Sequence, residues 1–259
     1  MVNKRLFFYF YAVDGYKDMY YYKMHLACLE HYANVFDEAI FIISVNDINN
    51  ESLINSVRND ILTHFKCKDI RFKVHKDDDY HESRVFYDMI YKKLDQLDGL
   101  TFFAHTKGVS NCYVSNDTMV DWILSLYWLS LSDIKDVCNA LLYSHFLFYG
   151  SFKLAHPTNE IVFNPQQMFY NGTFYWLNTS KVYNSLLVKK QNILLESRFT
   201  CEKFPGYFDN GIYGMASKGG LYWMTDFTYD YIPEALNFLT SVSRGEYEDF
   251  KKSILSKIE

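Results

Sequence analysis

The sequence has no surplus of basic residues. Its 26 Lys and Arg are outnumbered by 31 Asp and Glu, and the net charge at pH 7 is -5. Non-specific binding to nucleic acid relies on a surplus of Lys and Arg that faces the phosphates. The composition therefore argues against a general nucleic-acid-binding surface, and a nucleic-acid substrate would have to be held by a local basic patch.

Cysteine motifs and long apolar runs are missing as well. The five cysteines are scattered, with no C-x-x-C pair, which predicts reduced thiols in a reducing compartment. No segment approaches the roughly 20 apolar residues of a membrane-spanning helix. The aromatic run at residues 6–13 follows Lys4 and Arg5 but meets Asp14 without a small-x-small cleavage site, so it predicts a buried strand rather than a signal peptide. We therefore expect a cytoplasmic protein without a transmembrane segment.

Strand-like and helix-like segments alternate over the first hundred residues. Apolar runs predict strands at residues 6–13, 39–45, 70–75 and 100–104. Apolar residues at helical spacing predict helices at residues 20–36, 53–65 and 82–94. This alternation is typical of βαβ units, so the predicted fold class is α/β with a mainly parallel central sheet flanked by helices. In such sheets ligands bind beyond the carboxyl ends of the strands.

The later part of the chain has a different pattern. Residues 117–149 predict a long, mostly helical stretch, and residues 161–177 are aromatic and β-prone. Residues 233–259 predict one or two amphipathic helices. We expect these helices to pack on the body of the protein, with peripheral attachment to a membrane surface as the alternative.

The segment His105-Thr106-Lys107-Gly108 directly follows the fourth predicted strand. Lys107 can neutralise phosphate charge as a point cation, and Gly108 allows the backbone to approach a ligand closely. His105 could donate a hydrogen bond to a phosphate or sugar oxygen. A polar turn with a surface lysine is the alternative interpretation, and the residue types alone do not separate the two.

Asp77-Asp78-Asp79 follows the third predicted strand. Carboxylate oxygens are the ligands that Mg²⁺ and Mn²⁺ use when they bridge a diphosphate, so Asp77 and Asp79 are candidate metal ligands. A solvated acidic turn is the favoured interpretation of three adjacent carboxylates. Arg84, near the start of the next helix, is a candidate partner for a phosphate or for this turn.

The segment around Gly172 carries candidate sugar-binding groups. Alternating aromatic residues around Gly172 suit a strand that lines a cleft, which makes Asn171, Thr173, Tyr175 and Trp176 candidate sugar-binding residues. A core strand with a bulge at the glycine is the alternative, and it is the favoured one.

Glu202 and Asp209 flank the Pro205-Gly206 turn. A carboxylate in this setting can act as a general base that accepts the proton of an acceptor hydroxyl. Carboxylates in loops are more often simply solvated. The aromatic residues and the arginine of the same segment make the catalytic interpretation worth testing.

The order of these features along the chain resembles a family. An N-terminal strand, a helix that begins at Glu82, the motif from His105 to Ser110 and Trp122 occur in that order, followed by residues 171–178 and by Arg198 with Glu202. This order is similar to that of bacterial glycosyltransferases of the GT-A type from surface-polysaccharide loci, including those akin to rhamnan-synthesis proteins. The resemblance implies a Rossmann-like GT-A fold and a nucleotide-diphosphate sugar donor. It also implies transfer of a hexose or pentose to a glycan hydroxyl.

One departure from the wider GT-A pattern concerns the metal. The resemblance implies an Asp-x-Asp after the fourth strand, whereas this chain has His105-Thr106-Lys107 in that place. Either Lys107 replaces the metal beside the leaving diphosphate, or Asp77 to Asp79 hold Mg²⁺ or Mn²⁺ from the neighbouring loop. The requirement for a divalent cation stays open.

No Pro-, Gly- or Ser-rich linker and no internal repeat separates two domains. We expect one domain over residues 1–259, with a nucleotide-sugar-binding half at residues 1–110. Residues 111–259 would then form an acceptor-facing half.

Two alternatives concern the acceptor and the activity. The Asn-, Lys-, Tyr- and Phe-rich composition is similar to that of phage-encoded proteins, and a phage transferase in the host cytoplasm would glycosylate a hydroxymethylated DNA base. The acidic net charge favours a glycan acceptor over DNA. A non-catalytic glycan-binding module, with Phe174, Tyr175 and Trp176 as its stacking platform, is the alternative of another class.

Overall fold

A computed structural model describes most of the chain. The described residues are 2–106, 117–151, 153–155, 168–170, 173–190, 192–208, 215–217, 221–223 and 245–258. For the four three-residue segments in this set, only the backbone is described.

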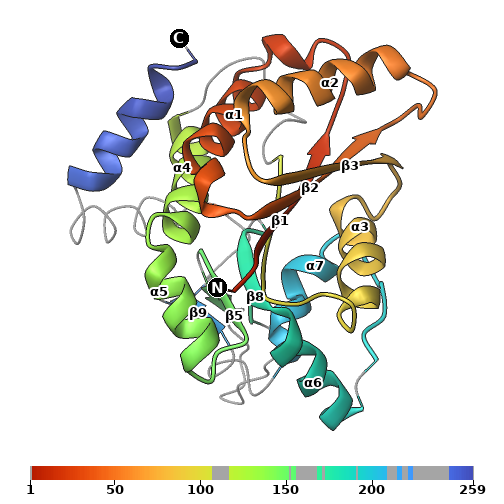
Figure 1. The fold of residues 1–259 in the computed structure, drawn as a ribbon, viewed down its shortest axis with the longest axis vertical. Helices are drawn as coiled ribbons and strands as arrows, with labels where there is room; N and C mark the ends of the chain where they lie inside the picture. The colour runs from red at the N-terminus through yellow and green to blue at the C-terminus, as the bar shows by residue number, and fades with distance from the viewer. Residues whose placement is uncertain are drawn as a thin grey trace.

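A seven-stranded sheet forms the centre of the molecule (Figure 1). Its first four strands are parallel, and they are β1 (Lys4–Tyr11), β2 (Glu38–Val45), β3 (Asp69–Lys76) and β4 (Leu100–His105). The other three are β5 (Phe148–Gly150), β8 (Tyr175–Asn178) and β9 (Met215–Ser217). The order across the sheet is β3-β2-β1-β4-β8-β5-β9, and only β8 runs against its neighbours. The predicted α/β class with a mostly parallel sheet is confirmed.

Helices cover both faces of this sheet (Figure 1). One face packs against α1 (Tyr20–Tyr32), α2 (Glu51–His64) and α4 (Asp117–Leu131). The other packs against α3 (Glu82–Met89), α6 (Thr179–Lys189) and α7 (Thr200–Lys203). Two layers of helix therefore enclose the sheet, which explains why its central strands are apolar on both faces.

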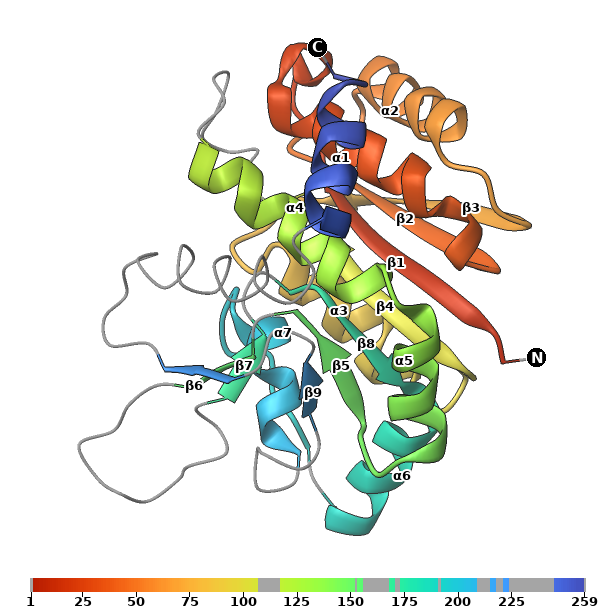
Figure 2. The same ribbon diagram turned by 90° about the vertical axis from the view of Figure 1, so that its left-hand side faces the viewer.

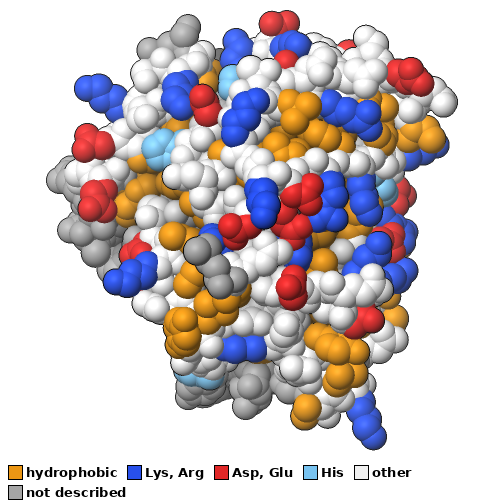
Figure 3. All heavy atoms as spheres, viewed as in Figure 1, with side chains coloured by type: hydrophobic (Ala, Val, Ile, Leu, Met, Phe, Trp, Pro, Cys, Tyr) orange, Lys and Arg blue, Asp and Glu red, His pale blue; other side chains and the backbone are white. Residues whose placement is uncertain are grey.

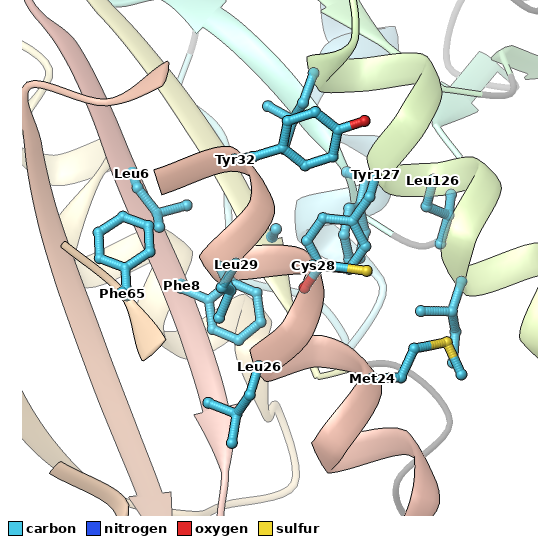
Figure 4. Packing of buried hydrophobic residues seen from close by; sticks show 14 of the residues in the cluster. Leu6, Phe8, Met24, Leu26, Cys28, Leu29, Tyr32, Phe65, Leu126 and Tyr127 are labelled. Atoms are coloured by element: carbon cyan, nitrogen blue, oxygen red, sulfur yellow. The ribbon is translucent and has the colours of Figure 1, made fainter. Parts of the chain in front are cut away.

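Strand β1 contributes side chains to the apolar cores on both faces of the sheet. Successive side chains of a strand point to opposite faces. Leu6, Phe8 and Phe10 join the core on the α1 side, whereas Phe7 and Tyr9 join the core on the α3 side. Figure 4 shows part of the first core, with Leu6 and Phe8 of β1 near α1 and with Cys28 of α1 beside Tyr127 of α4.

The predicted elements of the first hundred residues are present, with shifted ends. The first strand begins and ends two residues before the predicted 6–13. The helix predicted at 20–36 ends at Tyr32 and continues as a 3₁₀ turn, Ala33–Val35. The helix predicted at 82–94 ends at Met89, before the 3₁₀ turn Tyr91–Lys93.

The mostly helical stretch predicted at residues 117–149 is present, but it is divided into shorter helices and ends in a strand. Helix α4 ends at Leu131, and α5 (Ile134–Cys138) begins anew because the Asp133 side chain accepts a hydrogen bond from the Asp136 amide at 3.1 Å. A π-helical turn, Asn139–Tyr143, leads into β5, which completes the sheet beside β8. The β-prone stretch at 161–177 contains β7 (Met168–Tyr170) and the first part of β8. A second, three-stranded sheet joins β7 to β6 (Lys153–Ala155) and β10 (Leu221–Trp223).

A C-terminal helix at residues 245–255 packs against α1 and α4 (Figures 1 and 2). Its apolar side chains Tyr247, Phe250 and Ile254 are buried in the core on the α1 side. The Tyr247 hydroxyl donates to Asp121 Oδ1 of α4 at 3.1 Å, and Lys251 Nζ lies 2.5 Å from the same oxygen. The prediction that this tail packs on the body is confirmed for this helix, and its apolar face is not available to a membrane.

The fold also bears on three expectations from composition. None of the helices in the described part of the chain has both the length and the apolarity that a bilayer crossing requires. Cys28, Cys67, Cys138 and Cys201 form no disulfide within the described ranges. On the face drawn in Figure 3, Lys and Arg side chains are interspersed with Asp and Glu.

Candidate functional site

The candidate site lies at the carboxyl ends of β1 and β4, where the strand order reverses. The chain builds β1, β2 and β3 outward in one direction and then returns through α3 to place β4 on the other side of β1. Ligands of doubly wound α/β proteins bind at such a point. Tyr9 on β1 lies in register with His105 at the end of β4. The last residues of these two strands therefore stand side by side where a ligand is expected.

Tyr9, Ser44 and Asp77 form a hydrogen-bonded group beneath this edge. The Tyr9 hydroxyl lies 2.6 Å from Asp77 Oδ1 and 2.9 Å from Ser44 Oγ. Burial, together with the bond to Asp77, raises the pKa of Tyr9, so the phenol stays protonated. A hydroxyl carries one proton, and the carboxylate is the stronger acceptor. Tyr9 therefore donates to Asp77 and can accept from Ser44.

Asp77 also holds a histidine at the start of α3. Its Oδ2 lies 3.0 Å from His81 Nδ1, and its side chain is only 8% exposed. His81 has a positive φ of 46°, a conformation that is strained for a residue with a side chain. The carboxylate of Asp77 thus faces inward, where Tyr9 and His81 fix it.

These contacts bear on the predicted metal site. The Asp77 carboxylate is engaged by Tyr9 and His81, whereas Asp79 is exposed. Over the described ranges, no three His, Cys, Asp or Glu side chains are grouped as metal ligands. The requirement for Mg²⁺ or Mn²⁺ therefore stays a prediction.

Arg84 is engaged by the acidic turn. Its Nε donates to Asp78 Oδ2 at 3.0 Å, and its guanidinium lies 4.7 Å from the centre of the Tyr80 ring. Partial burial opposes ionisation of Asp78, but hydrogen bonds from the Tyr80 amide and Arg84 outweigh it and hold the pKa of this carboxyl below its usual value. A phosphate and the acidic turn are the two expected partners of Arg84. In the structure Arg84 contacts the acidic turn.

The half-buried Glu82 lies near the buried His105 at the centre of the site. Glu82 Oε1 of α3 lies 3.9 Å from His105 Nδ1, and the two side chains are 16% and 8% exposed. The next residue, Thr106, fixes the end of β4, because its hydroxyl accepts from the Tyr11 amide at 3.0 Å. Glu82 was not predicted as a site residue. An acidic residue in the first turn of a helix is so common that the sequence gives no signal for this role.

Helix α7 brings a second carboxylate to the same region. The Ser83 hydroxyl donates to the Arg198 carbonyl at 2.7 Å and accepts from the Cys201 amide at 3.0 Å, which ties α7 to the start of α3. Thr173, buried and with φ 58°, donates from Oγ1 to Glu202 Oε1 at 3.4 Å. Glu202, which the sequence predicts as a catalytic base, is therefore a buried carboxylate rather than a solvated loop residue.

The thiol of Cys201 is buried near two negatively charged side chains. Burial, together with the negative charges of Glu82 and Glu202, raises the pKa of this thiol well above its ordinary value. Cys201 is thus an unreactive thiol. Both carboxylates are close enough for their charges to act on this thiol.

The predicted roles of Tyr175 and Trp176 in sugar binding need correction. Both side chains are fully buried in β8, an inner strand with α-helices over both faces. The Tyr175 hydroxyl donates to the Cys201 carbonyl at 2.8 Å, and Trp176 Nε1 donates to the Ser130 carbonyl at 2.8 Å. Neither ring has a free face for a sugar. The core-strand alternative describes these two residues correctly.

Four further predicted site residues lie outside the described residues. They are Lys107, Gly108, Asn171 and Asp209. Of the others, His105 and Glu202 approach the group around Glu82, and Thr173 contacts Glu202. Neither the comparison with models of known protein families nor the search of curated proteins gave a match for this chain.

Proposed function

We propose that the chain is a glycosyltransferase that moves a sugar from a nucleotide-diphosphate donor to a hydroxyl acceptor. The observation that carries the proposal is the position of His105. It ends β4 beside β1 where the strand order reverses, and Glu82 lies against it. The strand order β3-β2-β1-β4 and the resemblance of the His105 motif support a GT-A type of Rossmann-like fold.

The proposed reaction breaks the bond between the anomeric carbon and the diphosphate oxygen as the acceptor oxygen bonds to that carbon. The diphosphate leaves with the electron pair, and a protein group accepts the acceptor proton. Lys107 and His105, at the end of β4, are proposed to face the diphosphate. Glu202 or Asp209 is proposed as the proton acceptor, and the buried position of Glu202 beside Thr173 suits a carboxylate held in a fixed geometry.

The proposed acceptor is a surface glycan, and the proposed location is the cytoplasm, where nucleotide-sugars are made. Two observations weigh against the alternatives. A glycan-binding module that stacks sugars on Tyr175 and Trp176 would need exposed rings, and both rings are buried. A DNA-modifying enzyme would have to hold DNA by a local basic patch, because the net charge is -5.

A panel of nucleotides tests the proposal. The purified protein should be stabilised against heat by at least one of UDP, GDP and TDP, because a ligand that binds only the folded state raises its melting temperature. Nucleotides that lack the diphosphate serve as controls. If none of these compounds, nor any of their nucleotide-sugars, shifts the melting temperature at about millimolar concentration, the proposed donor site is wrong.

A further inference from the structure

The histidine at the start of α3 is held by a buried carboxylate through one of its two ring nitrogens. His81 Nδ1 lies 3.0 Å from Asp77 Oδ2 and 3.1 Å from Asp77 Oδ1. The side chain of Asp77 is 8% exposed, whereas that of His81 is 39% exposed. An ionised carboxylate has no proton to donate, so the proton of this contact belongs to Nδ1.

The carboxylate of Asp77 is itself fixed from the sheet. The Tyr9 hydroxyl lies 2.6 Å from Asp77 Oδ1, and the Ser44 hydroxyl lies 3.3 Å from the same oxygen. The backbone of His81 adds a second constraint, because its φ of 46° is in the left-handed region. Residues with a side chain rarely adopt this conformation, and those that do are concentrated at ligand-binding and active sites. The His81 ring is therefore anchored to the ends of β1, β2 and β3.

The second ring nitrogen of His81 is not used by this anchor. Both hydrogen-bond contacts of the ring involve Nδ1, and Nε2 has no hydrogen-bond partner in the part of the chain that the structure describes. Nε2 of His75 is buried without a partner, but Nε2 of His81 is not. This nitrogen therefore reaches the surface at the carboxyl edge of the sheet. In a neutral imidazole with its proton on Nδ1, Nε2 is a hydrogen-bond acceptor.

An acceptor nitrogen selects the kind of group that it can bind. Ionised phosphate oxygens are themselves acceptors, so they do not pair with the lone pair of Nε2. A hydroxyl can donate its proton to this nitrogen. Most hydrogen-bond donors of a nucleotide-sugar are the hydroxyls of its ribose and of its transferred sugar. The chemistry of His81 thus suits the sugar parts of such a ligand rather than its phosphates.

We propose that His81 is a specificity-determining residue, which accepts a hydrogen bond at Nε2 from a sugar hydroxyl of the bound nucleotide-sugar. Asp77 is its positioning residue, because it holds the proton on Nδ1 and so keeps the lone pair of Nε2 available. The identity of the ligand rests on the proposed function, whereas the proton position in the pair of Asp77 and His81 does not. The hydroxyl belongs either to the ribose or to the transferred sugar, and binding measurements separate these two sources.

Heteronuclear NMR of the imidazole nitrogens tests the proton position. The protein has eight histidines, so the His81 signals are assigned by their loss in His81→Gln. At about pH 8, above the ordinary histidine range, Nδ1 should carry the proton and Nε2 should be unprotonated. Asp77→Ala should abolish this preference. Asp88→Ala, which removes a partly exposed carboxylate from the same helix, is the matched control and should leave the preference unchanged.

Calorimetric binding of UDP, GDP and TDP tests the ligand. Each is compared with its forms that lack one ribose hydroxyl and with UDP-glucose, GDP-mannose or TDP-glucose. If the ribose is the source, loss of the recognised hydroxyl should weaken binding to the wild type by about threefold to tenfold, and His81→Ala should bind both forms within about twofold. If the transferred sugar is the source, the wild type should bind the nucleotide-sugar more tightly than the nucleoside diphosphate by a similar factor, and His81→Ala should lose this gain.

His64→Ala, which removes a histidine at the end of α2, is the matched control for binding. It should bind every ligand as the wild type does. Cooperative unfolding on heating shows whether His81→Ala is folded. The comparison of ligands in the wild type needs no variant, so a misfolded His81→Ala does not remove the test.

Three results would overturn the inference. The first is a proton on Nε2 of His81 in the wild type at about pH 8, even if Asp77→Ala fails to fold. The second is a wild type that binds all forms of a nucleotide, with and without these hydroxyls, equally well. The third is an equal loss of affinity for every ligand in His81→Ala, since a contact to the diphosphate would explain it. If no nucleoside diphosphate or nucleotide-sugar binds the wild type, the proposed function and the ligand named here are both wrong, and the NMR result still decides the proton position.

Discussion

The hydroxyl of Tyr9 on β1 reaches Oδ1 of Asp77, which follows β3, at 2.6 Å. Strand β2 lies between these two strands, so the bond passes beneath it, and Ser44 of β2 contacts both partners. One side chain thus connects three strands at the edge where the candidate site lies. The contact fixes Asp77 and, through it, His81 at the start of α3.

Replacing Tyr9 by Phe should destabilise the fold. The variant keeps the ring but leaves the buried Asp77 carboxylate without its closest donor. Hydrogen bonds to charged groups contribute about 1.5–3 kcal/mol, so the free energy of unfolding should fall by about that amount. Urea denaturation measures it. Tyr11→Phe is the control, because the Tyr11 hydroxyl makes an exposed bond of 3.4 Å and its loss should cost less than about 0.5 kcal/mol. Equal effects of the two variants would contradict this account of Tyr9.

The pair of Asp78 and Arg84 should stabilise the fold in a pH-dependent way. The pKa of Asp78 is lower in the folded chain than in the unfolded chain, where it is about 3.9. Stability from this group is therefore present above about pH 4 and is lost as the pH falls through the lower, folded value. Melting temperatures of the wild type and Asp78→Asn should differ at about pH 6, and the difference should shrink as the pH falls through the folded value. A difference that persists in acid would show that the carboxylate acts through its shape rather than its charge.

Lys107→Ala tests the leaving-group role of the residue that follows Thr106. A lysine that faces a diphosphate contributes to the stabilisation of charge in the transition state, and loss of one such contact costs about 10²- to 10³-fold in rate. The melting temperature should stay near that of the wild type. Release of nucleoside diphosphate from the nucleotide-sugar measures the rate. A variant with full activity would remove Lys107 from the proposed mechanism.

Glu202→Gln and Asp209→Asn test the proton acceptor. Each amide keeps the shape of the side chain and removes its ability to accept a proton at neutral pH. The variant at the true base should lose transfer to the acceptor and still bind the nucleotide. Transfer and nucleotide binding should be measured separately for each. If both variants keep near-normal transfer, the base lies elsewhere; if both also lose the nucleotide, the segment belongs to the donor site or to the structure.

Ile254→Ala should show that the C-terminal helix belongs to the fold. Ile254 is fully buried against α1 and α4, and truncation of such a side chain costs about 2–5 kcal/mol. Urea denaturation of the full chain measures the loss. Lys252→Ala, on the exposed side of the same helix, should change stability by less than about 0.5 kcal/mol. A neutral Ile254→Ala variant would show that the helix does not contribute to the core.

The sequence predicts the parallel half of the sheet well, because each strand there is a distinct apolar run followed by a helical pattern. It fails where short segments depend on their neighbours. The strand Phe148–Gly150 has three residues and looks like the end of a helix until β8 lies beside it. Tyr175 and Trp176 are correctly predicted in a strand, but the sequence does not show that this strand is an inner one with both faces covered.

The candidate site could be located but not fully assembled from the sequence. His105 follows an apolar strand, and that position alone predicts its place at the carboxyl edge. Its partner Glu82 is 23 residues away, and the contact depends on how α3 packs under the sheet. The contact between Thr173 and Glu202 likewise requires α7 to dock on α3 through Ser83. Contacts between separate elements carry no local pattern, so spacing does not reveal them.

The seating of the C-terminal helix on α1 and α4 has a consequence for synthesis of the protein. Phe250 packs against His31 and Tyr32 of α1, although it is made long after them. At roughly 5–20 residues per second, the ribosome needs on the order of 10 to 40 seconds to travel from one partner to the other. Throughout that interval the emerging chain presents an uncovered apolar surface. A nascent-chain chaperone that binds apolar segments could bind this surface throughout that interval.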